Sequence, residues 1–372
     1  MFLNSYIKEY GKYSFAQRPF NDVDALVLSE ISYLNLDRVI NKKNDGSFVI
    51  KDIDLSNIDE LTAQQSDMKK NKIMLPLLMK AKRYKDLVIS DVEFRNDNEE
   101  VCQFYAITIF FEDKMFLSFR GTDLTLRGWK ENLEMSYKNI IPGHNEAIRY
   151  TKKILKKYDF PFYLGGHSKG GNLAVYAGIK MPIEHYSRLQ HIYTFDGPGF
   201  FDEKLVKNIE ESPLHKKIIK YVPKESVVGI VLKHTKTAKI VDAVSVGVLQ
   251  HDPFNWKIND DGTFKLLKRR AVISYINEKS LNNWLDSLKT EDILLMSDIL
   301  FASFDDLSID LIQIKKNWWD TFHKIHQQYL KLSKEDRYRV RDIWFKLIKS
   351  NAKSTVTLIK EQTNKNRKKK SS

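Results

Sequence analysis

The chain has 372 residues, of which 42% are hydrophobic and 12% aromatic, so it is long enough to bury a substantial core. Its one cysteine, Cys102, excludes an intramolecular disulfide, and no apolar run approaches the roughly 18 residues that a membrane span requires. The formal net charge is +13, and residues 333–372 carry thirteen Lys or Arg against four Asp or Glu. This composition predicts one dominant folded domain followed by a basic segment.

The N-terminal residues resemble no export signal. Residues 1–9 have neither a basic leading region nor an apolar stretch, which predicts a cytoplasmic location. Residues 21–36 carry apolar side chains at helical spacing, with Asp22 placed to cap, and predict an amphipathic helix. A polar, loop-rich stretch follows over 41–72, with a short helix expected over 55–68 and another over 74–84. Residues 1–85 are therefore expected to form a helical lead-in.

A β-hairpin is predicted next. Residues 103–111 alternate in polarity, Glu112-Asp113-Lys114 can turn the chain back, and residues 115–119 form the partner strand. The strand ends at Arg120-Gly121-Thr122-Asp123, which places Thr122 at the edge of the sheet. An ordinary strand-ending turn would also explain this sequence. The apolar side chains between Thr125 and Gly143 can either form a flap over a site or pack against the sheet.

The most informative pattern is Gly166-His167-Ser168-Lys169-Gly170. It has Gly-x-Ser-x-Gly spacing between an apolar strand over 160–164 and a helix of small residues from Gly170. A serine on such a sharp strand-to-helix turn projects its hydroxyl from the sheet, and the helix N-terminus directs free amides at an anion beside it. A pattern with only three fixed residues also occurs by chance. The strand before it and the small-residue helix after it nevertheless predict a nucleophilic serine at position 168.

Acidic and imidazole side chains follow later strand-like runs. Asp196 ends the run 192–195, Glu225 follows 217–222, and His234 follows 227–232. His251 follows the apolar run 244–249 and precedes Pro253, which predicts a loop at a strand end. An Asx turn that caps the strand would equally explain Asp196.

After about residue 270 the pattern becomes helical. Apolar residues recur at three- and four-residue steps from Leu307 to Leu332 and again from Val340 to Ile348, as in helices with one apolar face. Residues 364–372 are too polar to fold. The sequence thus divides into a domain over 1–270, a helical extension over 271–363 and a disordered basic tail over 364–372.

Several of these motifs together resemble the class 3 lipases, a branch of the α/β-hydrolases. The motifs are the Phe-Arg-Gly-Thr strand end, the Gly-His-Ser-x-Gly-Gly elbow and a late histidine. The chain is more similar still to a bacterial lipase-like group called Mbeg-like, for which the resemblance implies no particular substrate. The residues that carry this second resemblance, which covers about 15–265, are Phe20–Asp24, Gly128–Glu131, Phe195–Gly199, Gln250–Pro253 and Trp256.

The resemblance implies an α/β-hydrolase fold, with a central, mostly parallel sheet flanked by helices, and a serine–acid–histidine chain order. Position and resemblance favour His251 as the base, with His234 as the alternative. Asp196 is the preferred acid. Glu225 lies nearer the acid's place in class 3 lipases, which have aspartate there, and Asp242 is a third candidate. The amides of Thr122 and Lys169 are expected to form an oxyanion hole.

These inferences predict a serine hydrolase that cleaves a carboxylic ester, small or lipid, through an acyl-serine, without metal or organic cofactor. The alternative is a hydrolase-fold scaffold without activity. The basic residues 333–372 can contact an anionic membrane at its periphery, can hold phosphate backbones, or can keep the protein in solution. Nucleic-acid binding is disfavoured, because nothing resembles a recognition helix, an RNA-binding sheet or a zinc site.

Overall fold

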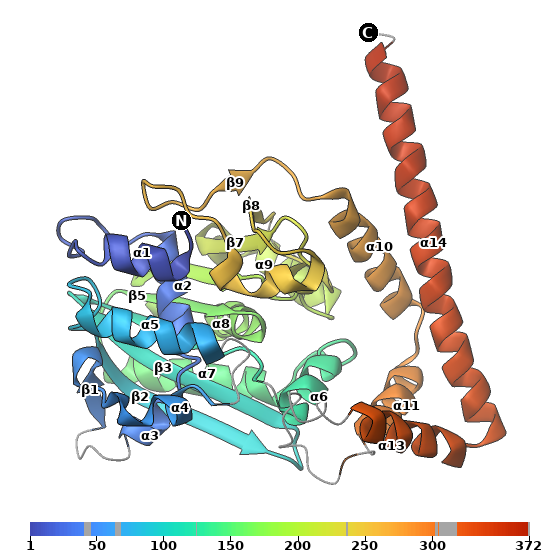
Figure 1. The fold of residues 1–372 in the computed structure, drawn as a ribbon, viewed down its shortest axis with the longest axis horizontal. Coiled ribbons are helices and arrows are strands. Elements are labelled where there is room, and N and C mark those ends of the chain that lie inside the picture. Colours follow the sequence, from blue (N-terminus) through green and yellow to red (C-terminus); the bar gives the residue numbers. More distant parts are fainter. Residues whose placement is uncertain are drawn as a thin grey trace.

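A nine-stranded sheet forms the centre of the molecule, and its strands lie side by side in sequence order (Figure 1). The computed structural model describes residues 1–40, 46–63, 68–123, 125–235, 237–301, 304 and 318–370. The strands are β1 (Ser47–Val49), β2 (Val88–Asp97), β3 (Cys102–Phe111), β4 (Lys114–Phe119), β5 (Phe162–His167), β6 (Leu189–Phe195), β7 (Ile218–Pro223), β8 (Lys239–Val241) and β9 (Leu266–Leu267).

The sheet is mixed rather than mostly parallel. Strands β4 to β8 pair in parallel, whereas β1 to β4 and the pair β8–β9 are antiparallel. The predicted hairpin is confirmed, since Phe111 of β3 pairs with Lys114 of β4. A connection this short permits only antiparallel pairing, while the longer connections after β4 and β5 contain helices and return the chain in parallel.

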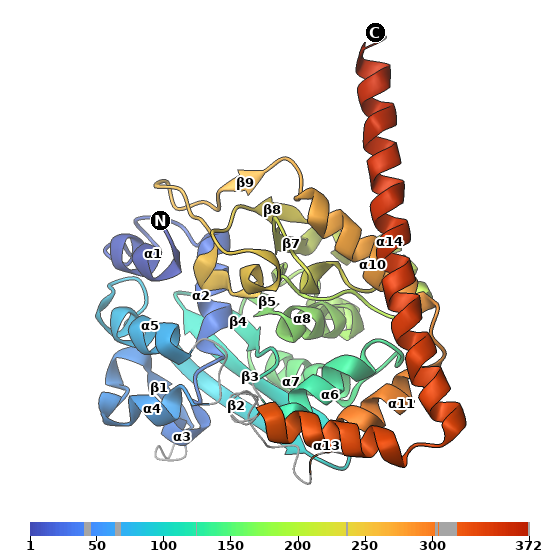
Figure 2. The ribbon, with the colours of Figure 1, turned by 45° about the vertical axis from the view of Figure 1, so that its right-hand side comes forward.

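Helices cover both faces of the sheet (Figure 2). Helix α2 packs on β4 and β5 from one side, with α1 and α5 beside it, while α8 packs on β4, β5 and β6 and α7 packs on β3 and α8. The helices of this part are α1 (Leu3–Tyr10), α2 (Asp22–Ile31), α3 (Asp37–Ile40), α4 (Ile58–Leu61), α5 (Met68–Lys80), α6 (Leu126–Glu134), α7 (Pro142–Lys157), α8 (Lys169–Lys180) and α9 (Glu203–Glu211).

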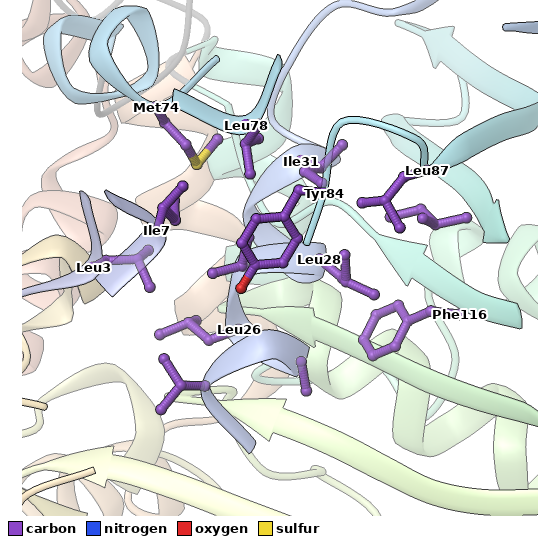
Figure 3. Packing of buried hydrophobic residues seen from close by; sticks show 14 of the residues in the cluster. Leu3, Ile7, Leu26, Leu28, Ile31, Met74, Leu78, Tyr84, Leu87 and Phe116 are labelled. Carbon is purple, nitrogen blue, oxygen red and sulfur yellow. The ribbon is translucent and has the colours of Figure 1, made fainter. Parts of the chain in front are cut away.

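Helix α2 is central rather than amphipathic. Every residue from Val23 to Ile31 is buried, because α1 and α5 cover the side of α2 that faces away from the sheet (Figure 3). Asn21, not Asp22, caps the helix, and it forms a capping box with Asp24. The predicted N-terminal helix therefore exists but ends at Ile31, and the lead-in belongs to the main core.

A buried ion pair fixes these helices to one another. The Arg83 guanidinium donates to both carboxylate oxygens of Asp24, and both side chains are fully inaccessible to solvent. The hydroxyls of Tyr6 and Tyr84 also donate to Asp24, at 3.1 and 2.6 Å. Because Asp24 lies on α2, Tyr6 on α1, and Arg83 and Tyr84 just after α5, one carboxylate joins three segments of the lead-in.

A second buried polar contact joins α7 to α8 on the other face. The His144 ring lies 4.1 Å from the Tyr176 ring, its Nδ1 accepts from the Ile141 amide, and its Nε2 contacts Asn172 Oδ1 at 2.8 Å. Since Nδ1 is an acceptor, Nε2 carries the proton and donates. Burial lowers the pKa of His144 to about 4, so the ring is neutral at physiological pH.

The C-terminal part is helical and comprises α10 (Val272–Asp286), α11 (Thr290–Phe301), α13 (Trp318–Lys331) and α14 (Lys334–Lys370). Helix α14 packs on α10 and α11, and its end projects away from the rest of the molecule (Figure 1). The predicted helix over 307–332 corresponds to α13 from residue 318, and 307–317 lie outside the described residues. Among the described helices, none has the length and hydrophobicity to cross a bilayer.

The structure differs from the expectation of an unfolded tail, because α14 continues as helix to Lys370. Lysine, arginine and glutamine have high helix propensity, so a polar sequence can extend a helix that is already nucleated. Residues 371 and 372 lie outside the described residues.

Asp24→Asn is expected to lower the free energy of unfolding by about 3–5 kcal/mol, because the Arg83 charge would remain buried without its partner. Urea denaturation measures this change. Asp86→Asn is the matched control, since Asp86 pairs with Lys51 at the exposed surface; it should leave stability nearly unchanged. Equal effects of the two substitutions would contradict the role assigned to the buried pair.

The neutral state of His144 predicts a pH dependence. Below about pH 6.5 this histidine is protonated in the unfolded chain, whereas in the native state it stays neutral until about pH 4. The wild type should therefore lose about 3 kcal/mol of stability across this interval, a loss that His144→Gln should not share. Denaturation at several pH values tests this against His323→Gln, which alters an exposed histidine. A stability difference independent of pH would refute it.

Candidate active site

Ser168 occupies the turn between β5 and α8 and has a backbone conformation that non-glycine residues rarely adopt. Its φ is 57° and its ψ is −133°. The Ser168 amide donates to Phe195 O of the neighbouring strand at 2.9 Å, and its carbonyl accepts from the Gly171 amide at 3.0 Å. The strain is thus held by hydrogen bonds on both sides of the turn, as the sequence pattern predicts.

Glycines around the turn permit a close approach between β4 and α8. A Cβ at Gly170 would collide with the Phe119 backbone, and a Cβ at Gly121 would lie 3.0 Å from Ser168 Cβ. The missing side chains therefore bring the end of β4 into direct contact with the serine turn. This contact brings Gly121, the residue before Thr122, against Ser168.

His251 and Asp196 form a direct hydrogen bond. His251 Nδ1 lies 2.7 Å from Asp196 Oδ2, and Asp196 is fully buried whereas His251 is partly exposed. The other Asp196 oxygen accepts from the Ser226 hydroxyl at 2.6 Å. Asp196 itself has a φ of 48°, and its amide donates to Tyr221 O of β7 at 2.8 Å. The carboxylate is therefore fixed in one orientation toward the imidazole.

The elbow histidine also positions His251. His167 Nε2 lies 2.9 Å from the His251 carbonyl oxygen, and the two rings are 4.6 Å apart. Since a carbonyl only accepts, His167 donates this bond through Nε2. The Tyr33 hydroxyl of the lead-in lies 3.3 Å from the other ring nitrogen of His167. The serine turn and the His251 loop are thus joined directly.

The segment before His251 is not a strand. Residues 247–251 form a 3-10 turn, and Val244, Val246, Val248 and Leu249 are each more than half exposed. The loop is closed by its own hydrogen bonds, since the Gln250 amide group donates to Ser245 O. The apolar run 244–249, interpreted from sequence as a strand, instead faces solvent, because β9 pairs with β8 at this edge of the sheet.

No hydrogen bond joins Ser168 Oγ to His251 within the described residues. Catalytic hydrogen bonds are often long or misaligned in the absence of substrate, so this does not remove His251 as a base. Both side chains belong to segments that contact each other through His167.

The other candidates have different partners. Glu225 accepts from the Gly247 amide at 2.7 Å, which helps shape the loop rather than orient the imidazole. Asp242 pairs with Lys224 and Lys257, at 3.3 and 2.8 Å. His234 Nδ1 lies 2.7 Å from Lys220 Nζ, and burial lowers the pKa of His234 well below its usual value. Among the five carboxylate and imidazole candidates, only Asp196 and His251 form an acid–imidazole hydrogen bond in the described residues.

Two backbone amides near Ser168 are available to an anion. The Lys169 amide is the first of α8 and has no intrahelical acceptor. The Thr122 amide makes no hydrogen bond in the part of the chain that the structure describes. The Thr122 hydroxyl, in contrast, donates to Asn132 Oδ1 at 2.8 Å. The amide of Thr122 is therefore a better candidate donor than its hydroxyl.

The Lys169 side chain faces neither solvent nor an open site. Its ammonium group is buried and lies 2.5 Å from Glu131 Oε2 of α6, 2.7 Å from Gln103 O and 3.0 Å from Gln103 Oε1. All three ammonium protons therefore have acceptors. The Lys169 side chain therefore forms a buried link between the elbow and α6.

The same contact determines the position of α6. Glu131 also accepts from the amides of Gln103 and Gly143, at 3.2 and 3.0 Å. Helix α6 thus presents a polar face to the core, and Trp129 on its other side is half exposed. Of the two interpretations of residues 125–143, packing against the sheet describes α6 better than a free flap.

Sequence reasoning missed Ser226, Glu131 and the role of His167. Ser226 lies one residue beyond a candidate acid and His167 lies within the elbow, so both were adjacent to recognised motifs. Glu131 lies in the motif Gly128–Glu131, but no local pattern indicated its buried pairing, because its partners Lys169 and Gln103 are distant in sequence.

Lys169→Met is expected to lower the free energy of unfolding by about 3–5 kcal/mol, since the Glu131 carboxylate would stay buried without its cation. Chemical denaturation followed by circular dichroism measures the loss. Lys138→Met is the control, because Lys138 lies beyond the end of α6, pairs there with Glu134 and is 40% exposed. An unchanged denaturation midpoint for Lys169→Met would show that the buried pair does not stabilise the elbow.

Comparisons with solved structures find distant similarities. Among solved structures, the chain is similar to the Rhizomucor miehei lipase in its propeptide complex, with 16% identity and a TM-score of 0.33 over 43% of this chain and 58% of that one. The Lip2 lipase from Yarrowia lipolytica has 14% identity and a TM-score of 0.33, over 53% and 80% of the two chains. The lipase from Rhizopus microsporus var. chinensis has 15% identity and a TM-score of 0.35, over 60% and 82%.

These similarities concern the fold alone, and they cover less than two thirds of the Rhizomucor lipase. A comparison with curated proteins finds no match. The chain has a mixed nine-stranded sheet flanked by helices on both faces. Residues 78–302, more than half of the chain, match the Mbeg1-like family, and this region includes α10 and α11. The chain belongs to the Mbeg1-like family.

Proposed function

We propose that this protein is a serine hydrolase that cleaves a carboxylic ester through an acyl-serine intermediate. The observation that carries the proposal is the hydrogen bond between His251 and a fully buried Asp196, beside a serine in a strained strand-to-helix turn. A buried carboxylate that fixes an imidazole is the arrangement that general-base activation of a hydroxyl requires.

In the first half of the reaction His251 Nε2 removes the Ser168 proton as the hydroxyl attacks the ester carbonyl. Asp196 binds the Nδ1 proton, which keeps Nε2 unprotonated and stabilises the imidazolium that forms. The amides of Thr122 and Lys169 bind the negative oxygen of the tetrahedral intermediate. His251 then protonates the leaving alcohol. In the second half a water molecule, deprotonated by His251, attacks the acyl-serine, and the acid is released as His251 returns the proton to Ser168. No metal or organic cofactor is required.

An apolar, lipid-like ester suits the surroundings of the site better than a small polar one. The exposed side chains Val244, Val246, Val248 and Leu249 directly precede His251. Clusters of exposed apolar residues are unusual on soluble proteins and mark contact surfaces. This loop supports an acyl chain as the substrate portion nearest the base.

Residues 333–372 are the proposed contact with an anionic membrane, by charge and by their position on a helix that projects from the molecule (Figure 2). The cytoplasmic location predicted from the N-terminus stays a prediction. The rival function is a scaffold that keeps the fold without activity, and the experiment below separates the two.

A fluorophosphonate probe should label the wild type, and Ser168→Ala should abolish labelling. His251→Ala and Asp196→Asn should each lower kcat/KM for ester hydrolysis by roughly 10²–10⁴-fold, because each disrupts proton transfer. Esters of increasing acyl length, assayed by product release, identify the preferred chain.

Glu225→Gln is the matched control, since it removes a neighbouring carboxylate that does not contact His251. If Glu225→Gln lost activity while Asp196→Asn kept it, the acid assignment would be wrong. A folded wild type that remains unlabelled with and without lipid vesicles would favour the scaffold.

A further inference from the structure

An apolar cavity of about 660 Å³ lies among the C-terminal helices and α6. Its wall is made of apolar and aromatic side chains from five helices, including Leu133, Trp284, Ile293, Met296, Phe322 and Trp344. The volume falls in the range of pockets that bind organic ligands. The cavity opens to the surface, because Phe322 and Trp344 are both more than half exposed. A cavity lined by apolar and aromatic side chains is complementary to a hydrocarbon chain.

The polar groups of the cavity wall indicate which headgroup a molecule with such a hydrocarbon chain would carry. The cavity wall includes Arg341 and His326, and no acidic side chain is among its residues within the described part of the chain. Arg341 contacts the Tyr338 ring and forms no ion pair in the described residues. Lys349 and Lys353 continue the positive charge along the exposed side of α14 and are likewise unpaired there. A negatively charged headgroup complements this surface.

Exposed apolar side chains on α13 and α14 flank the cavity. Trp319 is 65% exposed, Phe345 62% and Ile348 67%. Tryptophan and phenylalanine beside lysine and arginine are typical of helices that lie at a membrane surface. The cavity and its rim are thus complementary to the three parts of an anionic phospholipid: the acyl chain, the interfacial region and the charged headgroup.

We propose that this cavity binds one acyl chain of an anionic phospholipid while α13 and α14 rest on the bilayer. The inference deepens the membrane contact proposed above for residues 333–372 and does not depend on an active Ser168. It also places the lipid next to the catalytic domain, because Leu133 belongs to α6, whose Glu131 pairs with the elbow residue Lys169.

The test uses the full chain with Ser168→Ala, so that no lipid is hydrolysed. Vesicles of phosphatidylcholine, with and without phosphatidylglycerol, carry acyl chains brominated at mid-chain, which quench tryptophan fluorescence on contact. Quenching is expected with the anionic vesicles, and Trp284→Phe with Trp344→Phe should remove most of it, because these two rings line the cavity. Trp129→Phe is the control, since this exposed ring on α6 lies outside the cavity wall.

Two further variants separate the cavity from general adhesion. Phe322→Asp should weaken vesicle binding by about tenfold or more, because it places a charge in the apolar wall. Ile183→Asp, an equally drastic change at an exposed residue elsewhere, should not. Arg341→Glu should weaken binding to anionic vesicles only. Thermal unfolding of each variant shows whether it is folded.

The outcomes are distinct. Binding that is equal for neutral and anionic vesicles, or quenching that Trp284→Phe with Trp344→Phe leaves unchanged, would overturn the proposal. A dimer that forms without lipid and dissociates in Phe322→Asp would show instead that the cavity holds a second copy of the chain. Fluorophosphonate labelling of the protein with Ser168 intact is independent of these results, so loss of the proposed activity and loss of the lipid site are distinguishable.

Discussion

The strained conformation of Ser168 is the constraint on which the rest of the site depends. A positive φ at a non-glycine residue persists only where the surroundings hold it. Here β6 accepts from the Ser168 amide, and the absence of a side chain at Gly170 lets α8 approach the end of β4. The same approach brings Gly121, the residue before Thr122, against Ser168. The proposed geometry of nucleophile and oxyanion donors therefore rests on one close contact between a strand and a helix.

Buried polar groups stabilise this contact from several directions. Lys169, next to the serine, forms an ion pair with α6, and His167, on its other side, holds the His251 loop. Asn172, further along α8, donates to the Gly199 carbonyl at 2.8 Å and so supports the turn after Asp196. Buried groups of this kind are costly to leave unpaired, so the elements that carry the candidate triad are strongly coupled.

The C-terminal helices add a different kind of surface. The main domain buries most of its aromatic residues, whereas several on α13 and α14 are exposed near Arg341, Lys349 and Lys353, for which the described part of the chain shows no ion pair. A surface of this composition is unfavourable in water alone and favourable against a bilayer interface. The proposed lipid cavity and the proposed esterase site are linked through α6, which contributes to the wall of one and to the support of the other.

The sequence by itself determined the elements whose signals are local: the serine turn, the hairpin of β3 and β4, and Asp196 and His251 as candidates from their place after apolar runs. The prediction of the fold came from the resemblance of its motifs to a known family. Only the tertiary structure decided that Asp196 rather than Glu225 contacts His251, that Lys169 is buried against Glu131, and that residues 244–249 face solvent. The reason is physical. A turn or the hydrophobic periodicity of a helix is determined by neighbouring residues. The partner of a buried charge, and the segments that cover the outer side of a helix such as α2, come from distant parts of the chain.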